Sequence, residues 1–315
     1  MKVISCTIIL WFWASCAWSK PEVIPPTGVA YSANGHLVVL TASGAVARVV
    51  NAKVPISSFA IAPDRRSVIY APAGPQDAGG PLYELSLITG QARMLIRTQI
   101  YDKREVYADP DFSPDGSRIV FAIHAQPTGD GVTMAGPFAI FDTERQATRV
   151  LRSTMSFGGY GPTYGSGPRW SPGGNRIFLN LVGDFAITNR SGEHLQMPDQ
   201  WTHVPIENMF AIGWWGNNCI VYKGGDTWAI AETRPAKLLL IKSLRSRRLT
   251  TLLHADPADV THLVAFSPAI WVQKVGRTLV VHSHGRTWSV FTGTRYPYVR
   301  IFGGQSEQDV PRECK

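Results

Sequence analysis

The sequence is poor in charge, and it lacks the short motifs of nucleotide-binding and hydrolytic enzymes. Only 17% of its 315 residues are charged, and the 31 Lys and Arg residues are spread along the chain rather than gathered in an arm or a helical stripe; the densest stretch, residues 242–248, is expected at a hairpin turn of the fifth blade. This scatter argues against a nucleic-acid-binding protein, so we read the net charge of +8 as a contribution to solubility. There is no P-loop, no dinucleotide-binding glycine fingerprint and no G-x-S-x-G nucleophile elbow.

Long hydrophobic runs are also missing, except at the N-terminus. Residues 3–18 form a predominantly apolar run that follows Met1 and Lys2 and leads into Ser19 at an A-x-A-like cleavage pattern. We predict that residues 1–19 are a signal peptide and that the mature chain 20–315 is periplasmic or secreted, with no stable membrane insertion. The run is shorter than the ~20 residues of a spanning helix, which makes an uncleaved anchor the less favoured alternative.

Cysteine is scarce in the mature chain, because Cys6 and Cys16 leave with the predicted signal peptide. Cys219 and Cys314 remain, and an even pair in an oxidising compartment can form a disulfide. Two unpaired cysteines are an equal alternative, since the sequence does not give the distance between them.

A repeat organises the rest of the chain. Its two closest copies are residues 109–121 (DPDFSPDGSRIVF) and 167–179 (GPRWSPGGNRIFL), and four degenerate copies surround Tyr31, Ile61, Trp214 and Phe266. Asp-Gly or Gly-Gly supplies the positive φ of a tight turn, and the flanking runs are apolar and rich in β-branched and aromatic residues. Each copy therefore predicts a β-hairpin.

Most copies are followed by a third apolar run, such as residues 82–85 or 138–141, and then by a turn and a fourth run. Four-stranded antiparallel units in series are typical of propeller blades. The sequence thus predicts an all-β, six-bladed β-propeller and no second domain. The first two anchors, Tyr31 and Ile61, are only 30 residues apart, against 44 to 58 for the others, so the first blade is expected to be one strand short.

The two close copies resemble the repeat of TolB-like six-bladed β-propellers, which also occurs in propeller domains of prolyl-oligopeptidase-type proteins. Together the six copies span the mature chain. The resemblance implies the fold and says little about function. TolB has a further domain before its propeller, whereas about ten residues separate the predicted signal peptide from the first repeat here. This departure argues against a TolB role in the Tol-Pal envelope system.

Strand alternation places the residue before each anchor on one face of the innermost strands. These residues are Ala30, Ala60, Asp111, Arg169, Gly213 and Ala265. Asp111 and Arg169 are the only charges among them and come from consecutive blades, so we expect them to meet near the axis. They are candidate binding residues, and the alternative is an ion pair that neutralises itself at a blade junction.

Aromatic residues in loops provide further binding candidates. Tyr160 and Tyr164 lie in a Gly-rich loop before an innermost strand and are expected to present flat faces to a peptide or sugar, unless the loop is only a connector. Trp215 belongs to an aromatic cluster of the fifth blade, in which the neighbouring Trp214 is expected in the core.

Three histidines form the weak enzymatic alternative. His282 and His284 share one strand face, and His262 precedes the innermost strand of the same blade, but no carboxylate is spaced to complete a metal site. Polar packing of the strand is therefore the favoured interpretation. A metal-dependent lyase or hydrolase acting on an exported carbohydrate or peptide remains the second hypothesis.

The leading hypothesis is an exported, non-catalytic binding protein that recognises a cell-envelope or periplasmic protein or peptide at one face of the ring. We expect it to be a monomer, to use no cofactor and to bind no nucleic acid.

Overall fold

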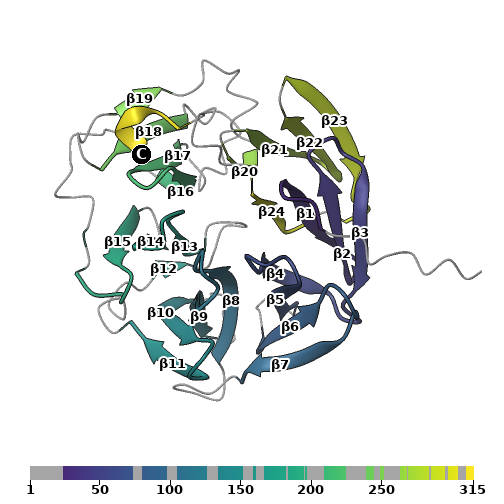
Figure 1. Cartoon of the computed structure of the whole chain (residues 1–315), viewed down its shortest axis with the longest axis horizontal. Helices are drawn as coiled ribbons and strands as arrows, with labels where there is room; N and C mark the ends of the chain where they lie inside the picture. Colours follow the sequence, from purple (N-terminus) through teal and green to yellow (C-terminus); the bar gives the residue numbers. More distant parts are fainter. Residues whose placement is uncertain are drawn as a thin grey trace, which may run out of the picture.

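The computed structural model describes residues 24–73, 80–97, 105–125, 134–151, 159–160, 167–181, 184–194, 196, 209–224, 239–244, 249–251, 263–267, 269–283, 285–294, 297–303 and 310–315. The strands of these residues form six antiparallel sheets, which stand around a common axis (Figure 1). Four of the sheets have four strands each. The predicted all-β propeller with four-stranded antiparallel blades is confirmed.

The first three sheets use the N-terminal half of the chain. The first contains β24 (Val299–Phe302), β1 (Gly28–Ala33), β2 (His36–Thr41) and β3 (Val46–Asn51). The second contains β4 (Ile56–Ile61), β5 (Ser67–Pro72), β6 (Leu82–Ser86) and β7 (Ala92–Ile96). The third contains β8 (Glu105–Phe112), β9 (Arg118–Ala125), β10 (Met134–Asp142) and β11 (Ala147–Val150), and β12 (Gly159–Tyr160) also pairs with β10.

The other three sheets follow in chain order. The fourth contains β13 (Arg169–Trp170), β14 (Arg176–Leu181) and β15 (Asp184–Asn189). The fifth contains β16 (Met209–Trp215), β17 (Cys219–Gly224), β18 (Leu239–Ser243) and β19 (Leu249–Thr251). The sixth contains β20 (Leu263–Phe266), β21 (Ile270–Val275), β22 (Thr278–Ser283) and β23 (Arg286–Phe291). The strands nearest the axis are β24, β4, β8, β13, β16 and β20 (Figure 1).

The hairpin turn between β8 and β9 shows why the repeat needs its residues. Gly116 has a φ of +73°, and its N–H donates to the carbonyl oxygen of Ser113 at 2.8 Å. The carboxylate of Asp115 accepts hydrogen bonds from the hydroxyls of Ser113 (2.6 Å) and Ser117 (2.8 Å). These hydrogen bonds hold the pKa of Asp115 well below its usual range, and the bond from the Ser113 hydroxyl has the largest effect.

The hydrophobic core lies between neighbouring sheets rather than along the axis. One cluster packs Leu37 and Val39 of the first sheet against Phe59, Val68 and Tyr70 of the second. Equivalent clusters join the second sheet to the third, the third to the fourth and the sixth to the first. Each sheet is thus stabilised by burying its apolar faces against its neighbours.

The two ends of the described chain close the ring. Strand β24 pairs with β1, with Ala30 opposite Arg300, and the N–H of Ser32 donates to the carbonyl oxygen of Tyr298 at 3.0 Å. The N-terminal segment therefore supplies three strands of the first sheet, and the C-terminal segment supplies the innermost one. This strand accounts for the short spacing of the first repeat.

Within the described residues, no helix has the length and the apolar character needed to cross a membrane. The predicted signal peptide, residues 1–19, lies outside the described part of the chain and stays a prediction.

Candidate functional site

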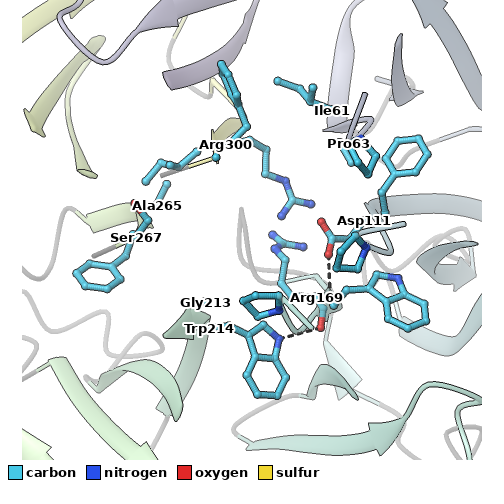
Figure 2. A pocket seen from close by; sticks show the side chains of 18 of the residues that line it. Ile61, Pro63, Asp111, Arg169, Gly213, Trp214, Ala265, Ser267 and Arg300 are labelled. Carbon is cyan, nitrogen blue, oxygen red and sulfur yellow. Dashed lines mark hydrogen bonds between the residues drawn. The ribbon is translucent and has the colours of Figure 1, made fainter. Parts of the chain in front are cut away.

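A cavity of about 580 Å³ lies on the ring axis, at the end where the inner strands finish (Figure 2). Residues at or near the last position of every inner strand line it: Ile61, Phe112, Trp170, Trp214, Phe266 and Phe302. Pro63, Pro114 and Pro172, which follow three of these strands, add to the wall. Because these positions belong to paired strands and tight turns, the cavity is built on the rigid part of the fold.

Five of the six axial residues expected from strand alternation line this cavity. They are Ala60, Asp111, Arg169, Gly213 and Ala265. The small residues leave space at the centre, and the two charged ones occupy consecutive inner strands, β8 and β13.

The expectation for the first sheet is wrong. Ala30 lies on β1, which is the second strand from the axis, and its cross-strand partner Arg300 takes the axial position on β24. Asp111 and Arg169 are therefore not the only charges of the ring. The alternation of β-branched and other residues in Val299–Phe302, together with the missing strand of the first repeat, is the signal that points to Arg300.

Backbone carbonyls of two other sheets hold the Arg300 side chain in place. Its Nε donates to the carbonyl oxygen of Phe59 at 3.0 Å, and Nη2 donates to the carbonyl oxygen of Pro110 at 2.8 Å. The guanidinium also lies 5.2 Å from the ring centre of Tyr298, and the residue is only 9% exposed. Burial is the largest influence on Arg300 and lowers the pKa of its guanidinium, with Arg169 next.

A bulge in β8 places a second acid behind the cavity wall. The pairing of β8 with β9 shifts register between Ala108 and Asp111, and Asp109 within the bulge has a φ of +51°. The Asp109 carboxylate accepts a hydrogen bond of 2.9 Å from the hydroxyl of Tyr298. Burial raises the pKa of the Tyr298 phenol far above its ordinary value, so this hydroxyl keeps its proton and acts as the donor.

Asp111 presents its carboxylate to both arginines (Figure 2). One of its oxygens accepts a hydrogen bond of 2.8 Å from the backbone N–H of Trp170. Burial raises the pKa of the Asp111 carboxyl, while Arg300, Arg169 and the Trp170 N–H act in the opposite direction. The two direct ion pairs that join described residues, Arg93 with Glu84 and Arg190 with Asp115, lie elsewhere at the surface.

Close packing of β13 against β8 positions Arg169. Its carbonyl oxygen accepts a hydrogen bond of 3.1 Å from the Trp214 indole, and its Nη1 donates to the carbonyl oxygen of Pro168 at 2.7 Å. A side chain at Gly167 would collide with the Cβ of Asp109, so this approach requires glycine. In Figure 2 the guanidinium groups of Arg169 and Arg300 point toward each other.

Of the two tyrosine candidates, only the backbone of Tyr160 falls within the described residues. The backbone of Tyr160 pairs with Met134 on β10, level with the start of β8, whereas Asp111 is near the end of β8. Tyr160 thus belongs to the other end of the third sheet. Tyr164 lies outside the described residues.

Trp215 is placed between the fifth and sixth sheets. Its ring centre is 6.1 Å from that of Phe266, and it also packs on the cluster of Cys219, Val310 and Cys314. The cavity is lined by its neighbour Trp214 instead.

Among the three histidines, only His282 falls within the described residues. It lies on β22, where its ring stacks on Trp271 at 3.7 Å and its nitrogens are 2.8 Å from Gln273 Oε1 and 3.1 Å from Thr287 Oγ1. These contacts fit polar packing of the strand. No group of three potential metal ligands occurs in the described part of the chain, and His262 and His284 lie outside it.

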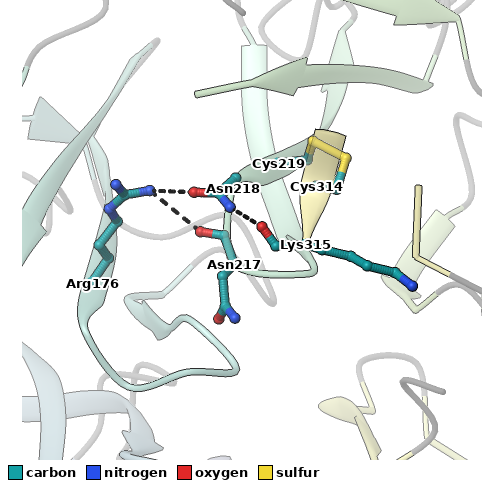
Figure 3. The surroundings of a disulfide bond; sticks show 6 residues. All are labelled: Arg176, Asn217, Asn218, Cys219, Cys314 and Lys315. Atoms are coloured by element: carbon teal, nitrogen blue, oxygen red, sulfur yellow. Dashed lines mark hydrogen bonds between the residues drawn. A yellow bond between two sulfur atoms is a disulfide. The ribbon is translucent and has the colours of Figure 1, made fainter. Parts of the chain in front are cut away.

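Cys219 and Cys314 form a disulfide that attaches the C-terminal tail to the fifth sheet (Figure 3). The tail is also held by hydrogen bonds from Asn218, whose N–H donates to the carbonyl oxygen of Cys314 at 3.1 Å and whose amide donates to that of Lys315. Arg176 of the fourth sheet donates to the Asn218 side chain at 3.1 Å. The C-terminal segment, which closes the ring through β24, is thus also attached to the fifth sheet.

Comparison with known proteins supports the fold and no more. No protein-family model and no curated protein sequence matches the chain. Among solved structures, an oligogalacturonate lyase in complex with manganese has 14% identity and a TM-score of 0.53, over 82% of this chain and 74% of that one.

Two further structures are less similar. An oligogalacturonate lyase from Vibrio parahaemolyticus has 10% identity and a TM-score of 0.49, over 86% of this chain and 81% of that one. A protein described as TolB from Agrobacterium tumefaciens has 12% identity and a TM-score of 0.40, over 88% of this chain and 99% of that one. At 14% identity the first of these matches speaks for a shared fold only, and the other two, with TM-scores of 0.49 and 0.40, carry no argument.

Proposed function

We propose that the protein is an exported, non-catalytic binding protein whose axial cavity receives part of an envelope protein or peptide. The observation that carries this proposal is the convergence of Arg169, Arg300 and Asp111 in a cavity lined by every inner strand. A volume of about 580 Å³ is in the range of ligand sites in proteins. Because the cavity is preformed, binding avoids a large ordering cost.

The proposal includes a ring of six blades. It is supported by the six sheets of the described residues and by the β24–β1 pairing that closes the first of them. The three-stranded fourth sheet gains a further contact through the bridge between Ile187 and Gln196, at the position of a fourth strand. The TolB-like resemblance of the repeat is consistent with this number.

The cavity is poorly equipped for catalysis. Among the described lining residues the titratable ones are Arg65, Asp111, Arg169 and Arg300, and Asp111 is the one carboxylic acid in this set. The lining hydroxyls of Ser171 and Ser267 are engaged with their own turns. A nucleophile with an adjacent base is thus not assembled from the described lining residues.

A cross-linked pull-down from an envelope extract tests this function. The bait is the mature chain as wild type, Arg169→Ala and Arg93→Ala, the last being an exposed arginine of β7 that serves as the matched control. We expect one abundant partner with the wild type and Arg93→Ala, and its loss with Arg169→Ala. Equal recovery by all three baits would contradict the cavity as the binding site.

Metal analysis of the purified protein separates the proposal from the lyase or hydrolase alternative. A binding protein of this design needs no metal. A stoichiometric divalent metal that is lost in His282→Ala would favour the enzyme and overturn the binding function.

A further inference from the structure

We propose that the axial cavity recognises a single carboxylate group of a peptide, held between the guanidinium groups of Arg169 and Arg300. The inference rests on the proposed binding function and specifies the chemistry of its ligand. Three features support it: the positions of Arg169 and Arg300, the positive charge of the described lining residues, and the mostly apolar side chains around them.

The guanidinium groups of Arg169 and Arg300 approach each other in the axial cavity. Backbone carbonyls fix Arg300 through Nε and Nη2, which uses two of the five N–H donors of its guanidinium. In the described part of the chain no acceptor is bonded to Nη1, and the guanidinium points toward that of Arg169 (Figure 2). Two cations in a region of low dielectric repel each other, and an anion placed between them turns this repulsion into attraction.

The formal charge of the described lining residues favours an anion. Arg65, Arg169 and Arg300 line the cavity together with a single acid, Asp111, so the formal charges of these four side chains sum to 3 − 1 = +2. Asp109 lies behind the wall, where it accepts the hydrogen bond of the Tyr298 hydroxyl. A carboxylate brings one negative charge to this cluster. A phosphate dianion would bring two next to both acidic residues, which is costly away from water.

The remaining lining favours a peptide over a saccharide. Most of the wall is apolar, from Ile61, Phe112, Phe266 and Phe302 to the indole of Trp214. The uncharged polar side chains of the lining are Ser171 and Ser267, and both already bond within their own hairpin turns. The hydroxyls of a sugar ring could bond only to Asp111 and the arginines among the described lining residues, whereas an apolar side chain beside a carboxylate also buries favourable area against the rest of the wall.

Isothermal titration with four small probes tests the proposal on the oxidised mature protein. The probes are N-acetyl-Gly-Phe with a free C-terminus, its C-terminal amide, N-acetyl-Asp-Phe-amide and inorganic phosphate. We expect at least one of the two carboxylate peptides to bind about tenfold more tightly than the amide, the factor that about 1.4 kcal/mol produces. The carboxylate peptide that binds more tightly shows whether the recognised carboxylate belongs to a chain terminus or to an acidic side chain. Phosphate should bind no better than the amide.

Arginine variants connect the preference to the two cations. In Arg169→Ala the carboxylate peptide should bind as weakly as the amide, in Arg169→Lys part of the preference should return, and Arg93→Ala should retain it fully. Urea unfolding of each variant shows that the fold is kept. Equal binding of acid and amide by the wild type, or an unchanged preference in Arg169→Ala, would overturn the proposal.

The pull-down with the wild type, Arg169→Ala and Arg93→Ala distinguishes failure of the binding function from failure of the carboxylate proposal. A partner that is captured by the wild type and lost in Arg169→Ala, together with equal binding of acid and amide, would sustain the binding function and refute the carboxylate. If the partner is captured equally by all baits and no probe binds, both fail.

Discussion

Ala30 and Arg300 lie directly opposite each other in the antiparallel pair of β1 and β24. Ala30 is fully buried at the first sheet, and Arg300 reaches from the same register position to the carbonyl oxygens of Phe59 and Pro110. One strand therefore closes the ring, bridges three sheets and supplies a cation to the cavity. The strand that closes the propeller thus also contributes Arg300 to the site.

Replacing Arg300 should destabilise the fold. In Arg300→Met the carbonyl oxygens of Phe59 and Pro110 lose their charged donor, and each unsatisfied buried group costs about 1–3 kcal/mol. We expect the free energy of unfolding, measured by urea titration, to fall by about 3 kcal/mol, since part of the stem packing is kept. The surface variant Arg93→Met should change it by less than about 0.5 kcal/mol. A similar small effect for both variants would show that Arg300 does not hold the sheets together.

The inner residues of five sheets were predictable because their signals are local. The turn residues of each hairpin fix where β4, β8, β13, β16 and β20 end, and alternation then assigns Ala60, Asp111, Arg169, Gly213 and Ala265 to the axial face. The close copies of the repeat carry these signals most clearly, in residues 109–121 and 167–179.

Arg300 was not predicted, because its place depends on contacts between distant parts of the chain. It is 241 residues from Phe59, whose carbonyl oxygen it bonds, and no turn motif of the repeat precedes β24. The bulge that sends Asp109 behind the cavity is likewise absent from the hairpin pattern, since it reflects the pairing of β8 with β9 and the close approach of Gly167. The sequence also does not show that Tyr160 and Asp111 lie at opposite ends of the third sheet, because strand order alone does not say at which end of a sheet a loop lies.

Asp111 should make stability depend on pH. Its folded-state pKa is raised above the ordinary value of 3.8, so the stability that its neutral form provides is present below that value and is lost as pH rises through the folded-state pKa. Asp111→Asn keeps an acceptor for the Trp170 N–H and does not ionise. We expect this variant to gain stability relative to the wild type as pH increases from acid to neutral.

Urea unfolding at several pH values, with exposed Asp64→Asn as a control, measures this effect. Arg169, Arg300 and the Trp170 N–H face Asp111 and oppose the influence of burial. A difference between Asp111→Asn and wild type that is constant with pH, or that declines toward neutral pH, would show that the arginines outweigh burial.

Asp115 should have the opposite pH dependence. Hydrogen bonds from Ser113 and Ser117 lower its pKa, so its contribution to stability is present above the ordinary value of 3.8 and is lost as pH falls. Because the side chain is half exposed, we expect Asp115→Asn to cost only about 1 kcal/mol at neutral pH. The cost should shrink in acid. Thermal unfolding at neutral and acid pH tests this, and an equal loss at both would contradict it.

Removing the disulfide should lower the stability of the protein, because the C-terminal tail is then held to the fifth sheet by hydrogen bonds without a covalent link. Cys219 and Cys314 are 95 residues apart, and a bond that closes a loop of this length contributes about 4.7 kcal/mol in the chain-entropy model. We expect the double variant Cys219→Ser/Cys314→Ser, and the reduced wild type, to unfold at a lower urea concentration than the oxidised protein. Identical transitions for oxidised and reduced protein, with both thiols open to alkylation, would refute the role of the bond.

The most direct test of the account is a crystal structure of the mature protein with whichever carboxylate peptide binds more tightly. The account predicts the carboxylate between Arg169 and Arg300, with the body of the peptide against the apolar wall near Phe266 and Phe302. Density for the peptide at the opposite end of the ring, beside Tyr160, with the axial cavity unchanged, would contradict it.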